Sequence, residues 1–172
     1  EITGSSSMTC TNEVFFPERT DSAASFIRFS MLNSRGEQTR VFSNSEGFTF
    51  EIEYVVNQTL SNDHIFLIIE RADGLLLLKA ADDDYGQTID SARKPGRYKT
   101  SIHFPGNILN EGLYQFRVVF GKRRGIHYDE RAGFSFEIED WNDYTNSSIG
   151  KRNGVLLMPI KWTQTKIMRF DN

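Results

Sequence analysis

The sequence predicts an all-β domain, an antiparallel β-sandwich of the jelly-roll or immunoglobulin-like kind with about nine strands. Apolar and polar residues alternate with a period of two in many segments, which is typical of strands with one packed face and one solvent face. Turn-forming residues recur roughly every ten residues between these segments. Phenylalanine outnumbers proline by 14 to four, which favours a folded, β-rich core over a disordered chain.

The clearest strand pair lies between residues 109 and 139. In the segment 112–121 every second residue is large and apolar, whereas Gln115 and Arg117 hold the opposite parity. The segment 133–139 repeats this alternation after a basic, turn-rich loop. We therefore expect two long antiparallel strands whose aromatic face packs on the core.

Further strands are expected on both sides of this pair. The run 64–70 is apolar on both parities, which predicts a central strand. Asp73 and Gly74 form a strong hairpin signal that returns the chain through a short strand. Pro105 ends another strand. Besides the pair already described, the expected strands cover residues 24–32, 39–42, 48–56, 64–70, 75–79, 97–104 and 155–162.

The chain divides into a short N-terminal segment and one domain. Residues 1–22 are rich in Gly, Ser, Thr and Asn, and Phe15 and Phe16 belong to their only apolar cluster. This composition predicts either a linker whose Phe pair docks on the domain or a tail tethered by nothing. Residues 23–172 are expected to form the sandwich. The missing initiator methionine suggests a domain cut from a longer polypeptide.

Charge, cysteine content and hydropathy exclude several classes of protein. The formal net charge of −3 is too near neutral to predict a nucleic-acid-binding protein. The single cysteine, Cys10, rules out an internal disulfide framework and fits a reducing compartment. No apolar run approaches the roughly 18 residues that indicate a transmembrane helix, and the N-terminus has no signal-peptide pattern. We expect no nucleic-acid partner and no direct membrane insertion.

Motifs for catalysis and cofactor binding are missing from the sequence. There is no glycine-rich nucleotide loop, no paired zinc-ligand motif and no nucleophile elbow. His64, His103 and His127 lie far apart, so we do not expect them to share a zinc ion. The aspartates at 82–84 are consecutive rather than alternating, which argues against a calcium loop and predicts a solvated loop. We expect no cofactor, no metal and no enzymatic activity.

The order and spacing of five motifs resemble one known family. It is the Wzt-type carbohydrate-binding domain, the C-terminal domain of the ATP-binding subunit of bacterial O-antigen polysaccharide ABC exporters. Each motif alone is only a strand with a turn, but together they cover most of residues 23–162. The motifs are F-x-x-S-E-G-F-T-F-E-I-E-Y at 42–54, I-I-E-R-A-D-G-L-L-L at 68–77, I-L-N-E-G-L-Y-Q-F-R-V at 108–118, G-F-S-F-E-I at 133–138 and G-V-L-L-M-P-I-K-W at 154–162.

The resemblance implies a function and a set of partners. The domain would bind the terminal residues, at the non-reducing end, of a finished O-antigen polysaccharide inside the cell and couple completed polymer to export. The transport ATPase would be the nucleotide-binding domain that precedes it in the full-length chain. The resemblance also implies a homodimer that exchanges the C-terminal strand 155–162, and the polar, glycine-bearing hinge 145–154 suits such an exchange. The alternative is a strand folded back on its own sheet.

The candidate glycan-binding residues follow from what a sugar needs. A sugar ring requires planar hydrogen-bonding side chains and an aromatic face. Gln115 and Arg117 are the most specific candidates, because they are polar positions inside an otherwise aromatic strand. The other candidates lie on neighbouring strands, in the basic loop and on the last strand: Arg28, Arg71, Lys79, His127, Tyr128 and Trp162. The charged residues can equally be ordinary solubilising groups, and Trp162 can anchor the exchanged strand.

Two other functions stay open at this stage. A protein-interaction or dimerisation module of the transporter would expose an apolar patch instead of a polar groove. A glycoside hydrolase on a jelly-roll scaffold would need two carboxylates facing one cleft at about 5–9.5 Å.

Overall fold

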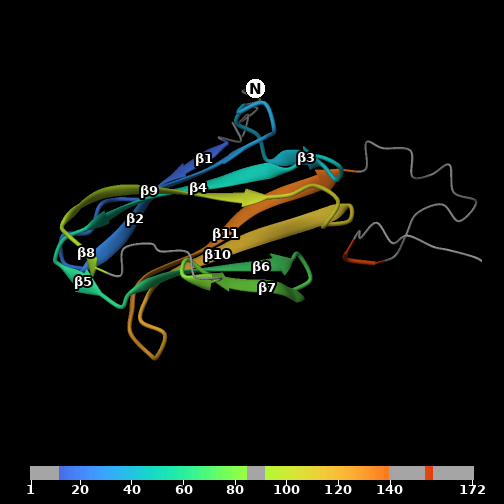
Figure 1. Cartoon of the computed structure of the whole chain (residues 1–172). Helices are drawn as coiled ribbons and strands as arrows, with labels where there is room; N and C mark the ends of the chain where they lie inside the picture. The colour runs from blue at the N-terminus through green and yellow to red at the C-terminus, as the bar shows by residue number, and fades with distance from the viewer. Residues whose placement is uncertain (1–11, 85–91, 140–153, 157–172) are drawn as a thin grey trace, which may run out of the picture.

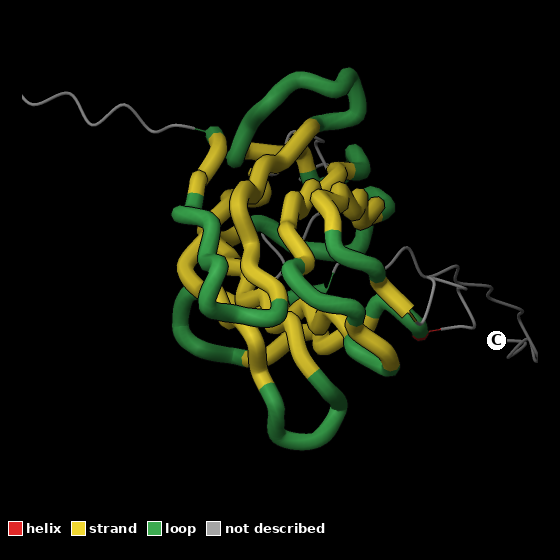
Figure 2. The backbone as a smooth tube through the Cα atoms, turned by 90° about the vertical axis from the view of Figure 1, so that its left-hand side faces the viewer, coloured by secondary structure: helices red, strands yellow, loops and turns green. Residues whose placement is uncertain are grey.

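The computed structural model describes residues 12–84, 92–139 and 154–156. Within these residues the chain forms eleven strands and no α-helix, and two sheets pack face to face (Figure 1). The tube in Figure 2 shows strands joined by loops throughout the described chain. The predicted all-β antiparallel sandwich is confirmed.

The first sheet, sheet A, has four strands in the order β1-β2-β4-β9, and all neighbours are antiparallel. Its strands are β1 (Glu13–Phe15), β2 (Ala24–Leu32), β4 (Phe48–Val56) and β9 (Gly96–Phe104).

The second sheet, sheet B, has five strands in the order β3-β11-β10-β6-β7. Its strands are β3 (Val41–Ser43), β6 (His64–Arg71), β7 (Leu76–Ala81), β10 (Gly112–Gly121) and β11 (His127–Glu139). Only β3 and β11 pair in parallel. A separate two-stranded ribbon joins β5 (Leu60–Ser61) to β8 (Ala92–Arg93).

The core between the sheets is built largely from aromatic rings. Phe50 of sheet A stacks on Phe116 of sheet B with ring centroids 4.2 Å apart and planes 11° from parallel. Phe50 also meets Phe29 and Phe134. The large apolar residues that alternate along 112–121 are fully buried, because their side chains face sheet A. The opposite parity therefore lies on the outer face of sheet B.

Three elements differ from the sequence expectation. β11 begins at His127, six residues before the predicted 133, because a register shift between Phe116 and Val118 breaks the alternation there. β3 pairs with a strand almost a hundred residues later, Phe42 opposite Ile138, a contact that local pattern cannot reveal. Within residues 1–22 the strand β1, which the sequence did not predict, pairs with β2. Phe16 packs edge-on against Phe29 at 4.9 Å, as expected of a docked segment, whereas Phe15 is exposed.

The C-terminal strand predicted at 155–162 is described only at its start. Leu156 forms a β-bridge with Leu109, and the Asn110 amide donates a 2.6 Å hydrogen bond to the carbonyl oxygen of Gly154. Residues 157–162, including Trp162, lie outside the described residues.

Candidate functional site

The outer face of sheet B is the first candidate site, because the antiparallel register aligns its polar side chains. Gln115 of β10 lies opposite Glu70 of β6 and Ser135 of β11. Arg117, two residues on, lies opposite Ile68, and Ile68 in turn lies opposite Lys79 of β7. The structure thus places the candidates Gln115, Arg117 and Lys79 on one surface.

This face has an apolar floor beneath its charged groups. Ile68 and Val119 are both only 4% exposed, although neither belongs to the core between the sheets. Phe66 is half-buried beside them, opposite Val119. The Lys79 ammonium lies 5.6 Å from the centroid of the Phe66 ring, within cation–π range. Long charged side chains commonly cover apolar surface in this way while their heads stay in water.

Arg117 is held in place by two carboxylates. Its Nη1 lies 3.2 Å from Oε1 of Glu130, and its Nη2 lies 3.2 Å from Oε1 of Glu70. The hydrogen bond to Glu130, followed by that to Glu70, raises the pKa of the guanidinium. The side chain remains partly exposed. The face therefore offers planar donors and acceptors in a fixed arrangement above an apolar floor, which suits a neutral or anionic sugar.

Two further candidates lie at the ends of inner strands of sheet B. Arg71 ends β6, and its Nε donates a 3.0 Å hydrogen bond to Asp73 in the hairpin turn. That pairing holds the pKa of Asp73 down at about 2. His127 begins β11 and lies 3.3 Å from Oε2 of Glu130 through its Nδ1. Glu130 therefore contacts both His127 and Arg117.

Arg28 lies on a different surface from Arg117. It projects from β2 on the outer face of sheet A, where its guanidinium forms ion pairs with Glu13 of β1 and Glu53 of β4. The hydrogen bond to Glu13 is the main reason that its pKa is raised. The sandwich therefore separates two arginines that the sequence suggested as neighbours, because β2 belongs to sheet A and β10 to sheet B.

Tyr128 contributes mainly to the packing of the fold and not to a binding surface. Its ring packs against the core, and its hydroxyl donates a 2.9 Å hydrogen bond to Oδ1 of Asp63. Burial, and then the hydrogen bond to that carboxylate, raises the pKa of Tyr128 to about 12. The phenol is thus engaged inside the molecule, so little of the ring is left for stacking on a sugar.

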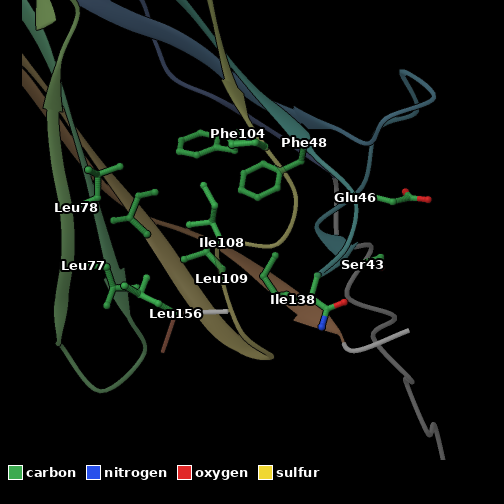
Figure 3. A pocket seen from close by; sticks show the side chains of 13 residues that line it. Ser43, Glu46, Phe48, Leu77, Leu78, Phe104, Ile108, Leu109, Ile138 and Leu156 are labelled. Atoms are coloured by element: carbon green, nitrogen blue, oxygen red, sulfur yellow. The ribbon is translucent and has the colours of Figure 1, made fainter. Parts of the chain in front are cut away.

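An apolar cavity of about 260 Å³ opens at one end of the sandwich (Figure 3). Phe48 and Phe104 stack on each other at 4.8 Å along one wall, and Leu77 and Leu78 of β7 form another. Leu156 lies at its rim. Sequence analysis missed this cavity because segments from six parts of the chain build it. Its lining suits an apolar side chain better than a sugar.

The aspartates at 82–84 differ from the solvated loop that we expected. The Asp82 side chain is only 7% exposed, because it forms an ion pair with Arg93. His64 lies 3.2 Å from Asp82 and 3.4 Å from Asp83. The pairing of β6 with β7 brings these residues together. The positive charge of Arg93 permits the burial of Asp82.

These features define a class: an antiparallel β-sandwich domain with a polar, ion-paired outer face over an apolar floor. The chain belongs to the Wzt C-terminal domain family, whose model matches residues 17–149. It is accordingly a domain of an O-antigen ABC transporter, a non-catalytic module of the transporter ATPase.

The fold is also that of a solved relative. The chain is similar to the crystal structure of the C-terminal domain of wzt, with a TM-score of 0.69 at 15% sequence identity. The alignment covers 88% of this chain and 91% of that one. No curated protein matches the sequence. In the part of the chain that the structure describes, no helix has the length and apolarity needed to cross a membrane.

Proposed function

We propose that the domain recognises the terminal, non-reducing-end residues of an O-antigen polysaccharide and thereby couples completed polymer to export. The polymer end would bind on the outer face of sheet B, at the cytoplasmic side of the membrane. Binding of the polymer end would be communicated to the nucleotide-binding domain of the full-length chain. The observation that carries this proposal is the alignment of Gln115, Arg117 and Lys79 above the floor of Phe66, Ile68 and Val119.

The chemistry of this face supports a sugar ligand of modest affinity. A neutral hydrogen bond contributes only about 0.5–1.5 kcal/mol, because the sugar gives up water to form it. A dissociation constant between roughly micromolar and millimolar is therefore expected. This range corresponds to a favourable binding free energy of about 8 to 4 kcal/mol. A ligand with a terminal acid or phosphate would compete with Glu70 and Glu130 for the Arg117 fork.

A calorimetric or NMR titration tests the proposal directly. Wild type, Arg117→Ala and Gln115→Ala would each be titrated with intact O-polysaccharide and with the same polymer lacking its terminal residue. We expect saturable binding to the intact end alone, weakened by both substitutions. Arg28→Ala is the matched control, since Arg28 is also held by two carboxylates but lies on sheet A. Equal loss from Arg28→Ala, or equal binding of both polymers, would contradict terminus recognition on sheet B.

We further propose a homodimer in which the strand 155–162 pairs with a neighbouring copy. The family resemblance and the polar, glycine-bearing composition of residues 145–154 support this proposal. The described bridge from Leu156 to Leu109 lies within one chain, so it fits the alternative of a strand folded back on its own sheet. Light scattering of the whole chain and of a chain ending at Asn153 tests the proposal. Exchange predicts a dimer that becomes a monomer on truncation. A whole chain that is monomeric would favour a strand folded back on its own sheet.

A protein-interaction role is the second candidate function, and one observation favours it. The β6–β7 hairpin exposes Leu75, Leu76 and Leu78 next to the apolar end cavity. An exposed apolar patch of this kind is typical of contact surfaces. If neither polymer binds in the titration while the dimer is stable, this function becomes the better account.

A further inference from the structure

A histidine and two aspartates converge at one end of the β6–β7 hairpin. The antiparallel register sets Phe66 opposite Ala81, so His64 at the start of β6 meets Asp82 and Asp83 just after β7. Nδ1 of His64 lies 3.2 Å from Oδ1 of Asp82 and 3.4 Å from Oδ1 of Asp83. These three atoms all lie within 4.8 Å of one another. Their separations are those of ligand atoms around one small cation.

The second carboxylate oxygen of each aspartate is already occupied. Oδ2 of Asp82 accepts hydrogen bonds from the Arg93 guanidinium and, at 3.0 Å, from the backbone N–H of Ile65. Oδ2 of Asp83 accepts a 2.6 Å hydrogen bond from Arg123. Each carboxylate is therefore oriented by an arginine on its far oxygen, and its Oδ1 is turned toward His64. Hydrogen bonds of this kind commonly fix the ligands of a metal site.

One atom of the cluster lacks a hydrogen-bond donor. Oδ1 of Asp83 is shielded from solvent and has no hydrogen-bond partner. Nδ1 of His64 also contacts Oδ1 of Asp82 at 3.2 Å. In the tautomer with hydrogen on Nε2, Nδ1 has a free lone pair for a cation and gives no hydrogen to either carboxylate. A buried carboxylate oxygen without a donor is costly, and a bound cation would remove that cost.

The charges around the cluster also favour a dication. Four aspartates lie at this end of the sandwich among the described residues, and two arginines are paired with them. The aspartates are Asp63, Asp82, Asp83 and Asp84, and the arginines are Arg93 and Arg123. Within this group the carboxylates outnumber the guanidiniums, and a bound cation would offset the remaining negative charge.

We propose that His64, Asp82 and Asp83 bind a divalent transition-metal ion of the Zn²⁺ or Mn²⁺ class. An imidazole nitrogen among the ligands favours these ions over Ca²⁺ and Mg²⁺, which prefer oxygen alone. The ion would join the start of β6 to the end of β7, at the end of the outer face of sheet B, where the His64 ring lies 6.1 Å from the Phe66 ring. Asp82 also lines a groove of about 350 Å³ between these strands and β9, which gives the site a route to solvent.

The test measures metal binding by the whole chain after chelator treatment. Calorimetry with Zn²⁺, Mn²⁺ and Ca²⁺, and the visible spectrum with Co²⁺, would be recorded for wild type, His64→Gln and Asp83→Asn. We expect one ion per chain, and affinity at least about tenfold lower in each variant. The melting temperature of the wild type should rise with Zn²⁺ or Mn²⁺ and not with Ca²⁺.

His103→Gln and Asp73→Asn are matched controls, because they remove the same groups from outside the cluster. Circular dichroism would verify that each variant is folded, and Asp83→Asn is the safer variant because its side chain is one third exposed. Absence of binding in the wild type, or wild-type affinity in both cluster variants, would overturn the proposal. Binding lost equally in the controls would do the same.

Discussion

The hydroxyl of Tyr128 donates a 2.9 Å hydrogen bond to Oδ1 of Asp63, a residue only 2% exposed. The contact ties the start of β11 to the turn before β6, 65 residues earlier in the chain. A carboxylate buried this deeply depends on its donors, because it has little water to replace them.

Tyr128→Phe should therefore destabilise the domain without affecting the outer face of sheet B. Loss of the donor leaves the Asp63 carboxylate short of a partner, which costs about 1–3 kcal/mol of unfolding free energy. Urea denaturation measures the loss, and polysaccharide titration of the same variant should give the wild-type affinity. Weakened binding by a fully stable variant would instead return Tyr128 to the ligand surface.

The central ring stack should dominate core stability. Phe50 touches Phe29, Phe116 and Phe134 and is fully buried, so Phe50→Ala should lower the unfolding free energy by about 3–5 kcal/mol. Phe15→Ala is the control, since Phe15 is 69% exposed, and should change stability by no more than about 0.5 kcal/mol. Similar losses in both variants would mean that the stack is not the centre of the core.

The turn between β10 and β11 requires glycine at position 121 for lack of space. A Cβ at Gly121 would lie 2.1 Å from the carbonyl oxygen of Ile126, so Gly121→Ala should cost about 1–3 kcal/mol through overpacking. At Gly96 the nearest atom is 3.6 Å away, and Gly96→Ala should be close to neutral. Thermal unfolding of both variants gives the comparison, and an unaffected Gly121→Ala would mean that the turn relaxes freely.

The carboxyl of Asp73 should titrate well below its usual range. The hydrogen bond from Arg71, aided by the backbone N–H of Leu75, lowers its pKa from 3.8 to about 2. A lowered pKa means that this interaction stabilises the fold above about pH 3.8 and is lost as the pH falls through about 2. NMR titration of the side-chain carboxyl should show this value. In Arg71→Gln the pKa should move back toward 3.8, and no movement would assign the shift to the backbone instead.

Local alternation was sufficient to predict the sandwich and the face on which most strands are buried. Gln115 and Arg117 were placed on the solvent parity from sequence because apolar and polar residues alternate from Tyr114 to Val118, and the structure has them there. Periodicity cannot reveal which strands are neighbours. Arg28 and Arg117 therefore seemed to belong together, although their strands lie in different sheets.

Burial of polar groups was equally hidden from local pattern. Asp82 is in a run of three acids, which by itself favours a solvated loop, and only its distant partner Arg93 permits the burial. Tyr128 likewise turns inward because Asp63 lies within reach of its hydroxyl. Both outcomes depend on contacts between residues that are separated in the sequence. Such contacts can be recognised only in the three-dimensional structure.

The alternation along β10 also bears on how such domains diverge. Gln115 and Arg117 are each flanked in sequence by two residues of the core, so adjacent positions of the strand have different structural roles. A substitution at Gln115 or Arg117 changes the exposed surface while Phe116 keeps its packing. Selection can therefore change this exposed surface at nearly constant stability, and related chains can share one scaffold while their sequences drift far apart.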